Sequence, residues 1–269
     1  MVQSTVVSVK NSSQKISPGS CPVLDKGFVC LDAAMADDLS VVNSARVSFA
    51  KRSYYEQVRV GDQCYCEDST KVCDCFEYRD QLKQEDIGLI KYLMQNRHGT
   101  PFEHNAFRFH IKCPLFVGRE WVRHRIGSFN EMSGRYTKLE AEFYIPDEWN
   151  VRTQEGKPGA YSFKRADADS ADAFRVMLSD HCDNAWSFYE HALENGIAKE
   201  QARFFLPVNV YTQFYWTINA RSLMNFLSLR NAEAAMWEIA EYAKVIESIF
   251  AIKMPETCKA FVVGGRIAP

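Results

Sequence analysis

The stretch RHRIGSFNEMSGRY, which begins at Arg123, is unusually dense in side chains that could bind an anion. Ser133 and Arg135 could hold a phosphate through one hydroxyl donor and one planar guanidinium group. Glu131 would instead accept a hydrogen bond from a sugar hydroxyl or a ring N–H. If this segment is extended, these three side chains project to one side. A solvated loop is the alternative, but it is disfavoured because Arg123 and Arg125 lie close upstream and such cations repel one another unless anions neutralise them.

A second polar group lies in NARSLMNFLSLR, which ends at Arg230. On a helix, Arg221 and Asn225 are four residues apart and share one face, with Ser228 close by. The rest of the segment is apolar, and buried Arg and Asn side chains need polar partners. The pattern indicates either a polar ligand or a salt-bridged Arg in the core. Arg203, in KEQARFFLP, is a further isolated cation that is either a ligand contact or a surface charge.

Two other groups could bind a metal. His98, Glu103 and His104 in HGTPFEH do not have HExxH spacing, so a loop that presents His98 and Thr100 to a ligand is favoured there. The second group is a pair of C-x-C motifs separated by six residues, which could bind zinc tetrahedrally. Structural zinc sites usually have C-x2-C spacing, so loop thiols, reduced or disulfide-linked, are favoured over zinc. These four cysteines are Cys64, Cys66, Cys73 and Cys75.

The bulk properties exclude several classes of protein. The chain has 269 residues, 46% of them hydrophobic, which is enough for a substantial core. Its net charge of −2 argues against nucleic acid as the main partner. No apolar run is long enough to span a membrane, and the start of the chain lacks the apolar region of a signal peptide, so we expect a cytoplasmic protein. The fingerprints GxGxxG, GxxxxGK[ST] and GxSxG are absent.

The elements that must position these groups follow from periodicity. We expect a polar arm at 1–20, a domain at 21–269 and an insertion or long loop at 51–83 that carries the cysteine pairs. Strands and helices are interspersed without regular βαβ units, which predicts an α+β fold with a mixed or antiparallel sheet flanked by long helices. The expected strands are 105–113, 139–145 and 209–218, and the expected helices are 84–97, 114–125, 170–196, 198–205, 221–230 and 232–252.

The opening stretch resembles the RHRxxSxNxxSxRY-type motif of the flavin-dependent thymidylate synthases. Three other segments resemble the same family in the same order: HGTPFEH, KEQARFFLP and YWTINARSLMNFLSLRNAEAAMWEIAEYA. Together they cover roughly residues 40–260, without the 51–83 region. The resemblance implies the single large domain of that family.

The resemblance also implies an activity. The family converts dUMP to dTMP with methylenetetrahydrofolate as carbon donor, FAD as redox cofactor and NADPH as reductant. It forms homotetramers in which each active site is assembled from more than one subunit. A flavin hydride takes part and no cysteine nucleophile is required, so Cys113 is expected to be a packing residue.

Carried over residue by residue, the resemblance assigns the site. Arg230 is expected to activate the uracil ring, and His98 to lie beside the ligands. The expected FAD contacts are Ser48, Thr100, Arg123, His124, Arg125, Glu131, Asn219, Arg221 and Asn225. The expected nucleotide contacts are Glu120, Arg123, Glu131, Ser133, Gly134, Arg135, Tyr136, Arg203 and Arg230.

Glu120 departs from the pattern, because the family often carries Gln at this position. A carboxylate would repel a nucleotide phosphate, so Glu120 points elsewhere, pairs with an arginine or weakens binding. Two alternatives to the enzyme remain: a non-catalytic flavin- or nucleotide-binding protein of the same fold, and a nucleic-acid binder, which the negative net charge disfavours.

Overall fold

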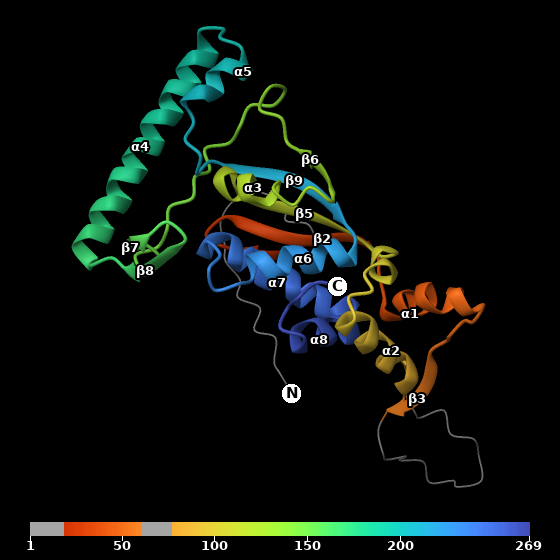
Figure 1. The fold of residues 1–269 in the computed structure, drawn as a ribbon. Coiled ribbons are helices and arrows are strands. Elements are labelled where there is room, and N and C mark those ends of the chain that lie inside the picture. The colour runs from red at the N-terminus through yellow and green to blue at the C-terminus, as the bar shows by residue number, and fades with distance from the viewer. Residues whose placement is uncertain (1–18, 61–76) are drawn as a thin grey trace, which may run out of the picture.

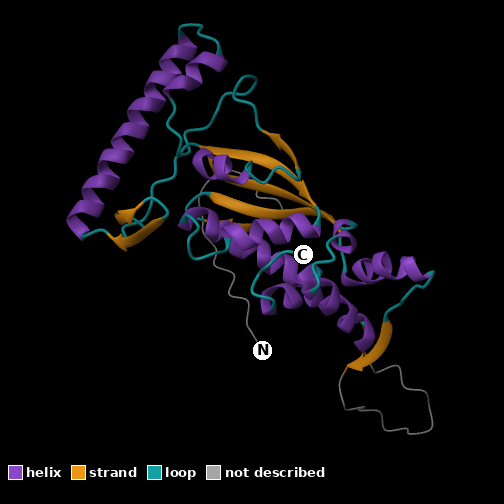
Figure 2. Ribbon diagram, viewed as in Figure 1, coloured by secondary structure: helices purple, strands orange, loops and turns teal. Residues whose placement is uncertain are grey.

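A computed structural model of the chain describes residues 19–60 and 77–269. Its centre is a five-stranded sheet of antiparallel strands in the order β1-β2-β5-β9-β6 (Figure 2). The predicted α+β fold with an antiparallel sheet and flanking helices is therefore confirmed. The five strands are β1 (Cys21–Val23), β2 (Gly27–Met35), β5 (Ala106–Pro114), β6 (Ser128–Glu131) and β9 (Tyr211–Ile218).

The central strand β5 matches the predicted strand 105–113 with a shift of one residue. Burial alternates along this strand as predicted: Phe107, Phe109 and Ile111 are fully buried, while Arg108 is exposed. Phe109 lies opposite Trp216 in the register of β5 with β9. The apolar face of the sheet is thus set by period-two alternation in both central strands.

Helices α3 (Leu115–Trp121), α6 (Ala220–Arg230) and α7 (Trp237–Lys253) pack against this apolar face (Figure 1). Trp121 joins them: its ring centroid is 5.3 Å from that of Trp216 in β9, 5.0 Å from Phe226 in α6 and 5.7 Å from Tyr242 in α7. All four rings are fully buried. This cluster fixes the residues around the end of α3 relative to the last turn of α6.

Three more helices pack together beside the sheet: α1 (Asp38–Arg46), α2 (Gln84–Gln95) and α8 (Pro255–Val263). The buried Asp38 carboxylate joins α1 to α8, because it accepts hydrogen bonds from the backbone N–H groups of Glu256 and Thr257 at the start of α8. The predicted helix 232–252 begins five residues later, at Trp237, and α8 is a separate helix that the sequence interpretation did not include.

The long helix α4 (Ala168–Glu194) stands apart from the sheet, with the hairpin of β7 (Arg152–Lys157) and β8 (Ala160–Arg165) at one end and α5 (Lys199–Ala202) at the other (Figure 1). Arg152 ties this arm to the body, because it donates to both carboxylate oxygens of Glu238 in α7, at 2.7 and 2.8 Å. The hairpin was not predicted, since its side chains are mostly exposed and lack an apolar period.

The predicted strand 139–145 is not a strand. Only an isolated antiparallel bridge forms, between Phe143 and Val210. Pro146 and Pro207 flank the two segments, and proline lacks the N–H needed to extend the pairing. The alternating apolar residues therefore reach the core without forming a ladder.

The region 51–83 is not simply a loop where the structure describes it. Strands β3 (Glu56–Val60) and β4 (Glu77–Gln81) pair as antiparallel strands at its two sides. The zinc candidates Cys64, Cys66, Cys73 and Cys75 lie outside the described residues. Among the residues that are described, no cluster of three metal-ligating side chains is present and no helix has the length and apolarity to cross a membrane.

Candidate active site

A basic cavity of about 700 Å³ lies where the end of α3 meets the two ends of α6. We call it the arginine cavity. It brings together residues that are almost 100 positions apart in the sequence, and most of them are predicted FAD contacts. Its predicted site residues are Arg123, His124, Arg125, Asn219, Arg221, Asn225 and Arg230.

The local structure explains this convergence. Asn219 caps α6, because its side chain accepts a hydrogen bond of 2.8 Å from the backbone N–H of Ser222. The buried Leu223 and Phe226 turn the opposite face of α6, with Arg221 and Asn225, toward the cavity. Segment 123–125 directly follows α3 rather than forming its last turn, since the helix ends at Trp121.

Arg230, the last residue of α6, contacts two residues at the end of α3. Its Nη1 donates to Glu120 Oε2 at 2.6 Å and its Nη2 to the Glu120 carbonyl oxygen at 3.2 Å. Its Nε donates to His124 Nε2 at 3.0 Å. Of the three outcomes expected for Glu120, pairing with an arginine is the one observed.

His124 is neutral in this arrangement. Burial, together with the adjacent Arg230 cation, lowers the pKa of His124 from 6.5 to about 4. Its Nε2 is the acceptor, so the ring proton is on Nδ1. His124 was predicted as a flavin contact. The structure places it in the wall of the arginine cavity and also in contact with Arg230.

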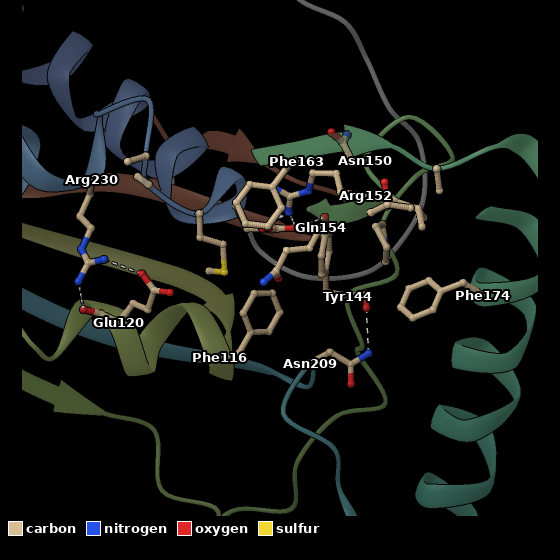
Figure 3. Close-up of a pocket in the computed structure, with 18 of the residues that line it drawn as sticks. Phe116, Glu120, Tyr144, Asn150, Arg152, Gln154, Phe163, Phe174, Asn209 and Arg230 are labelled. Carbon is tan, nitrogen blue, oxygen red and sulfur yellow. Dashed lines mark hydrogen bonds and ion pairs between the residues drawn. The ribbon is translucent and has the colours of Figure 1, made fainter. Parts of the chain in front are cut away.

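A second, larger cavity of about 1000 Å³ lies on the other side of Arg230, between α3, the β7–β8 hairpin, α4 and the segment that joins α6 to α7 (Figure 3). We call it the aromatic cavity, because Phe116, Tyr144, Phe163 and Phe174 line it. The charged side chains in its wall form two pairs, Arg230 with Glu120 and Arg152 with Glu238. Sequence reasoning missed the four rings, because they come from separate elements and share no motif.

A third cavity, of about 800 Å³, contains the predicted residues Ser48, His98 and Thr100, and we call it the His98 cavity. Arg221 lines it as well as the arginine cavity. Gly99 leaves the room for Arg221 to lie there, since a Cβ at position 99 would be 2.4 Å from Arg221 Nε.

Arg221 is held in place by two acceptors. It pairs with Glu103 at 2.5 Å and donates to the carbonyl oxygen of Pro269 at 2.8 Å. From the sequence, Glu103 was considered only as a disfavoured metal ligand. In the structure it forms this ion pair with Arg221.

The predicted phosphate contacts do not line any of these three cavities. The segment after Glu131 is a turn and not extended, because the N–H groups of Tyr136 and Thr137 both donate to the Ser133 carbonyl oxygen. The prediction that Glu131, Ser133 and Arg135 alternate along a strand is therefore wrong beyond Glu131. The turn pairs these backbone N–H groups locally, without a neighbouring strand.

These residues form a separate group near α5. Arg135 pairs with Glu200 at 3.0 Å, and both side chains are exposed. Gly134 lies against Arg203, where a Cβ would be 3.4 Å from Arg203 Cδ. Tyr136 is exposed beside Arg135, and Glu131 accepts a hydrogen bond of 2.6 Å from Thr212.

The cysteines of the described residues lie outside the three cavities. Cys113 is fully buried, and this burial raises the pKa of its thiol well above the usual value. Burial also raises the pKa of Cys30, Cys182 and Cys258. No cysteine of the described residues lines the arginine, aromatic or His98 cavity.

Comparison with known proteins agrees with the motif resemblance. Residues 31–256 match a family described as thymidylate synthase complementing protein. A flavin-dependent thymidylate synthase of Thermosipho africanus is 43% identical over 240 residues, which cover 89% of this chain and 92% of that protein. One from Tropheryma whipplei is 47% identical over 197 residues, covering 71% and 82%.

Solved structures are similar too. A crystal structure of the UMP/dUMP methylase PolB from Streptomyces cacaoi bound with 5-Br UMP has a TM-score of 0.76 and 35% sequence identity to this chain. The matched residues cover 92% of this chain and 98% of the PolB chain. The match in sequence extends over most of the chain, and the match in structure covers 92% of it. The chain therefore belongs to the flavin-dependent thymidylate synthases, a family of methyltransferases.

Proposed function

We propose that the chain converts dUMP to dTMP, with methylenetetrahydrofolate as carbon donor, FAD as redox cofactor and NADPH as reductant. The observation that carries the proposal is the position of Arg230, which lies in the wall shared by a cavity of arginines and a cavity of aromatic rings. One cation is thereby adjacent both to a place suited to phosphates and to a place suited to a flat ring.

The arginine cavity fits FAD. The cofactor carries a pyrophosphate, which needs several charge-assisted donors. Within residues 19–60 and 77–269, Arg123 and Arg125 form no ion pair with a carboxylate, so their charges are available to a ligand. Bound flavin would supply the hydride that completes the new methyl group. The proposed FAD contacts are Ser48, Thr100, Arg123, His124, Arg125, Glu131, Asn219, Arg221 and Asn225.

The nucleotide requires a second subunit. Ser133, Gly134, Arg135 and Arg203 form one cluster suited to a phosphate, and this cluster does not line the cavities that Arg230 lines. We therefore propose that the phosphate is held by this cluster on one subunit and the uracil ring is met by Arg230 of another. A homotetramer with shared active sites satisfies this requirement.

Arg230 would activate the uracil ring electrostatically. The ring carbon attacks the one-carbon unit more readily when the ring is ionised, and a fixed guanidinium beside the ring lowers the cost of that negative charge. No thiol lines either cavity among the described residues, which supports activation without a cysteine nucleophile.

The flavin assignment is tested by titration. We expect the purified protein to bind FAD and to show flavin absorbance, and we expect Arg123→Ala with Arg125→Ala to weaken FAD binding roughly tenfold to a hundredfold for each charge-assisted hydrogen bond lost. Arg119→Ala is the matched control, because Arg119 is exposed on α3 and lines none of the three cavities. A protein that takes up no FAD would overturn both the enzyme and the flavin-binding alternative.

A further inference from the structure

The contacts of Arg230 account for most of its hydrogen-bonding capacity. A guanidinium has five N–H groups. Three are used within the chain: one on Nε to His124, one on Nη1 to the Glu120 carboxylate and one on Nη2 to the Glu120 carbonyl oxygen. Two N–H groups remain, one on each terminal nitrogen. The side chain of Arg230 is 20% exposed, so these two groups are the part of the guanidinium that a ligand can reach.

The two partners of Arg230 are themselves fixed. Glu120 lies in the last turn of α3, next to Trp121, whose ring is fully buried against α6 and α7. The ring of His124 packs edge-on against Phe226, with centroids 4.9 Å apart. The backbone of Glu120 and the ring of His124 are therefore held by the same aromatic cluster, and Arg230 is attached to the two residues at three points.

This attachment has a consequence for catalysis. A mobile arginine side chain loses rotamer entropy when it is ordered. The side chain of Arg230 is already ordered in the folded chain before any ligand binds, because acceptors on two sides fix the plane of its guanidinium group. A donor that needs no reorganisation stabilises developing charge more effectively than a mobile one.

We propose that Glu120 and His124 are positioning residues that orient Arg230, so that its two remaining N–H groups face the negative charge that develops on the pyrimidine ring. This inference rests on the proposed function. It assigns to Glu120 a role through Arg230 and not through the nucleotide phosphate. The acceptor oxygen is the feature that matters, so a glutamine at position 120 would preserve the orientation and an alanine would not.

The kinetic test compares Glu120→Ala with Glu120→Gln. We expect Glu120→Ala to lower kcat roughly tenfold to a hundredfold, because a misplaced catalytic group costs about that much, and to change the KM for dUMP by less than about threefold. Glu120→Gln is expected to restore most of kcat. Adding Glu120→Ala to Arg230→Ala should cause no further loss. Glu233→Ala is the control, because Glu233 is exposed and lies outside both cavities.

If Glu120 has a merely structural role, Glu120→Ala will lower stability, and Glu120→Gln will not restore kcat. The losses of kcat in Glu120→Ala and Arg230→Ala will then also be additive in the double variant. Either result would overturn the proposal. The orientation is also measured without turnover, from the exchange rate of the Arg230 Nε–H in NMR spectra. Slow exchange in wild type and Glu120→Gln, with fast exchange in Glu120→Ala, is expected. If wild type makes no dTMP but shows this pattern, the proposed function fails and the positioning stands. Equally slow exchange in Glu120→Ala contradicts the positioning whatever the kinetics.

Discussion

Arg230→Ala is expected to bind FAD and fold normally while forming dTMP roughly a hundredfold to a thousandfold more slowly, as is typical when one donor to a developing charge is removed. Arg230 is the last residue of α6, and its side chain is not among the rings that pack around Trp121. Of its two partners, Glu120 is 35% exposed and can be solvated, and His124 lines the arginine cavity.

Steady-state kinetics with saturating FAD, together with a thermal unfolding curve, would measure this effect. Arg230→Lys is the informative companion variant, because it keeps the charge but loses the fork that reaches both Glu120 and His124. We expect it to recover only a small part of kcat. Turnover by Arg230→Ala at the wild-type rate would refute the role of Arg230.

Ser133→Ala combined with Arg135→Ala is expected to raise the KM for dUMP strongly while leaving FAD affinity unchanged. Charge-assisted hydrogen bonds to a phosphate contribute about 1.5–3 kcal/mol each, so the loss of Arg135 alone corresponds to roughly a tenfold to hundredfold weaker complex. Stability should change little, since the ion pair of Arg135 with Glu200 is exposed on both sides.

The measurement is a pair of titrations on the same variant, one with dUMP and one with FAD. Lys138→Ala is the matched control, because Lys138 is a nearby exposed cation that pairs with Glu190 and is not a predicted contact. Loss of flavin binding with dUMP affinity retained would mean that the two sites have been assigned the wrong way round.

Much of the fold was predictable because its signals are local. The alternation in β5 and the apolar stripe of α6 depend only on neighbouring residues, and both elements form close to their predicted bounds. The β7–β8 hairpin was not predictable, since its side chains are mostly exposed and the ion pair that ties it to α7 joins Arg152 to Glu238, 86 residues away. Likewise, nothing in the sequence separates α7 from α8 except Pro255.

The candidate site, too, was predictable in part from the sequence. The resemblance to the family predicted that Arg123, Arg221 and Arg230 belong to one site, and the structure gathers all three around one cavity. The partner of Glu120 could not be predicted, because three outcomes were compatible with its position in the sequence. The turn at Ser133 replaced an expected strand, since β6 has only four residues paired with β9 and ends at Glu131.

The most direct test of the central claim is an assay of the purified chain with dUMP, methylenetetrahydrofolate, FAD and NADPH, in which dTMP is identified by mass spectrometry. The account predicts dTMP in the complete mixture, none when any one component is omitted, and roughly a hundredfold to a thousandfold slower formation when Arg230→Ala replaces the wild type. A protein that binds FAD and dUMP but forms no dTMP in the complete mixture would contradict the account and would identify the chain as a non-catalytic binding protein.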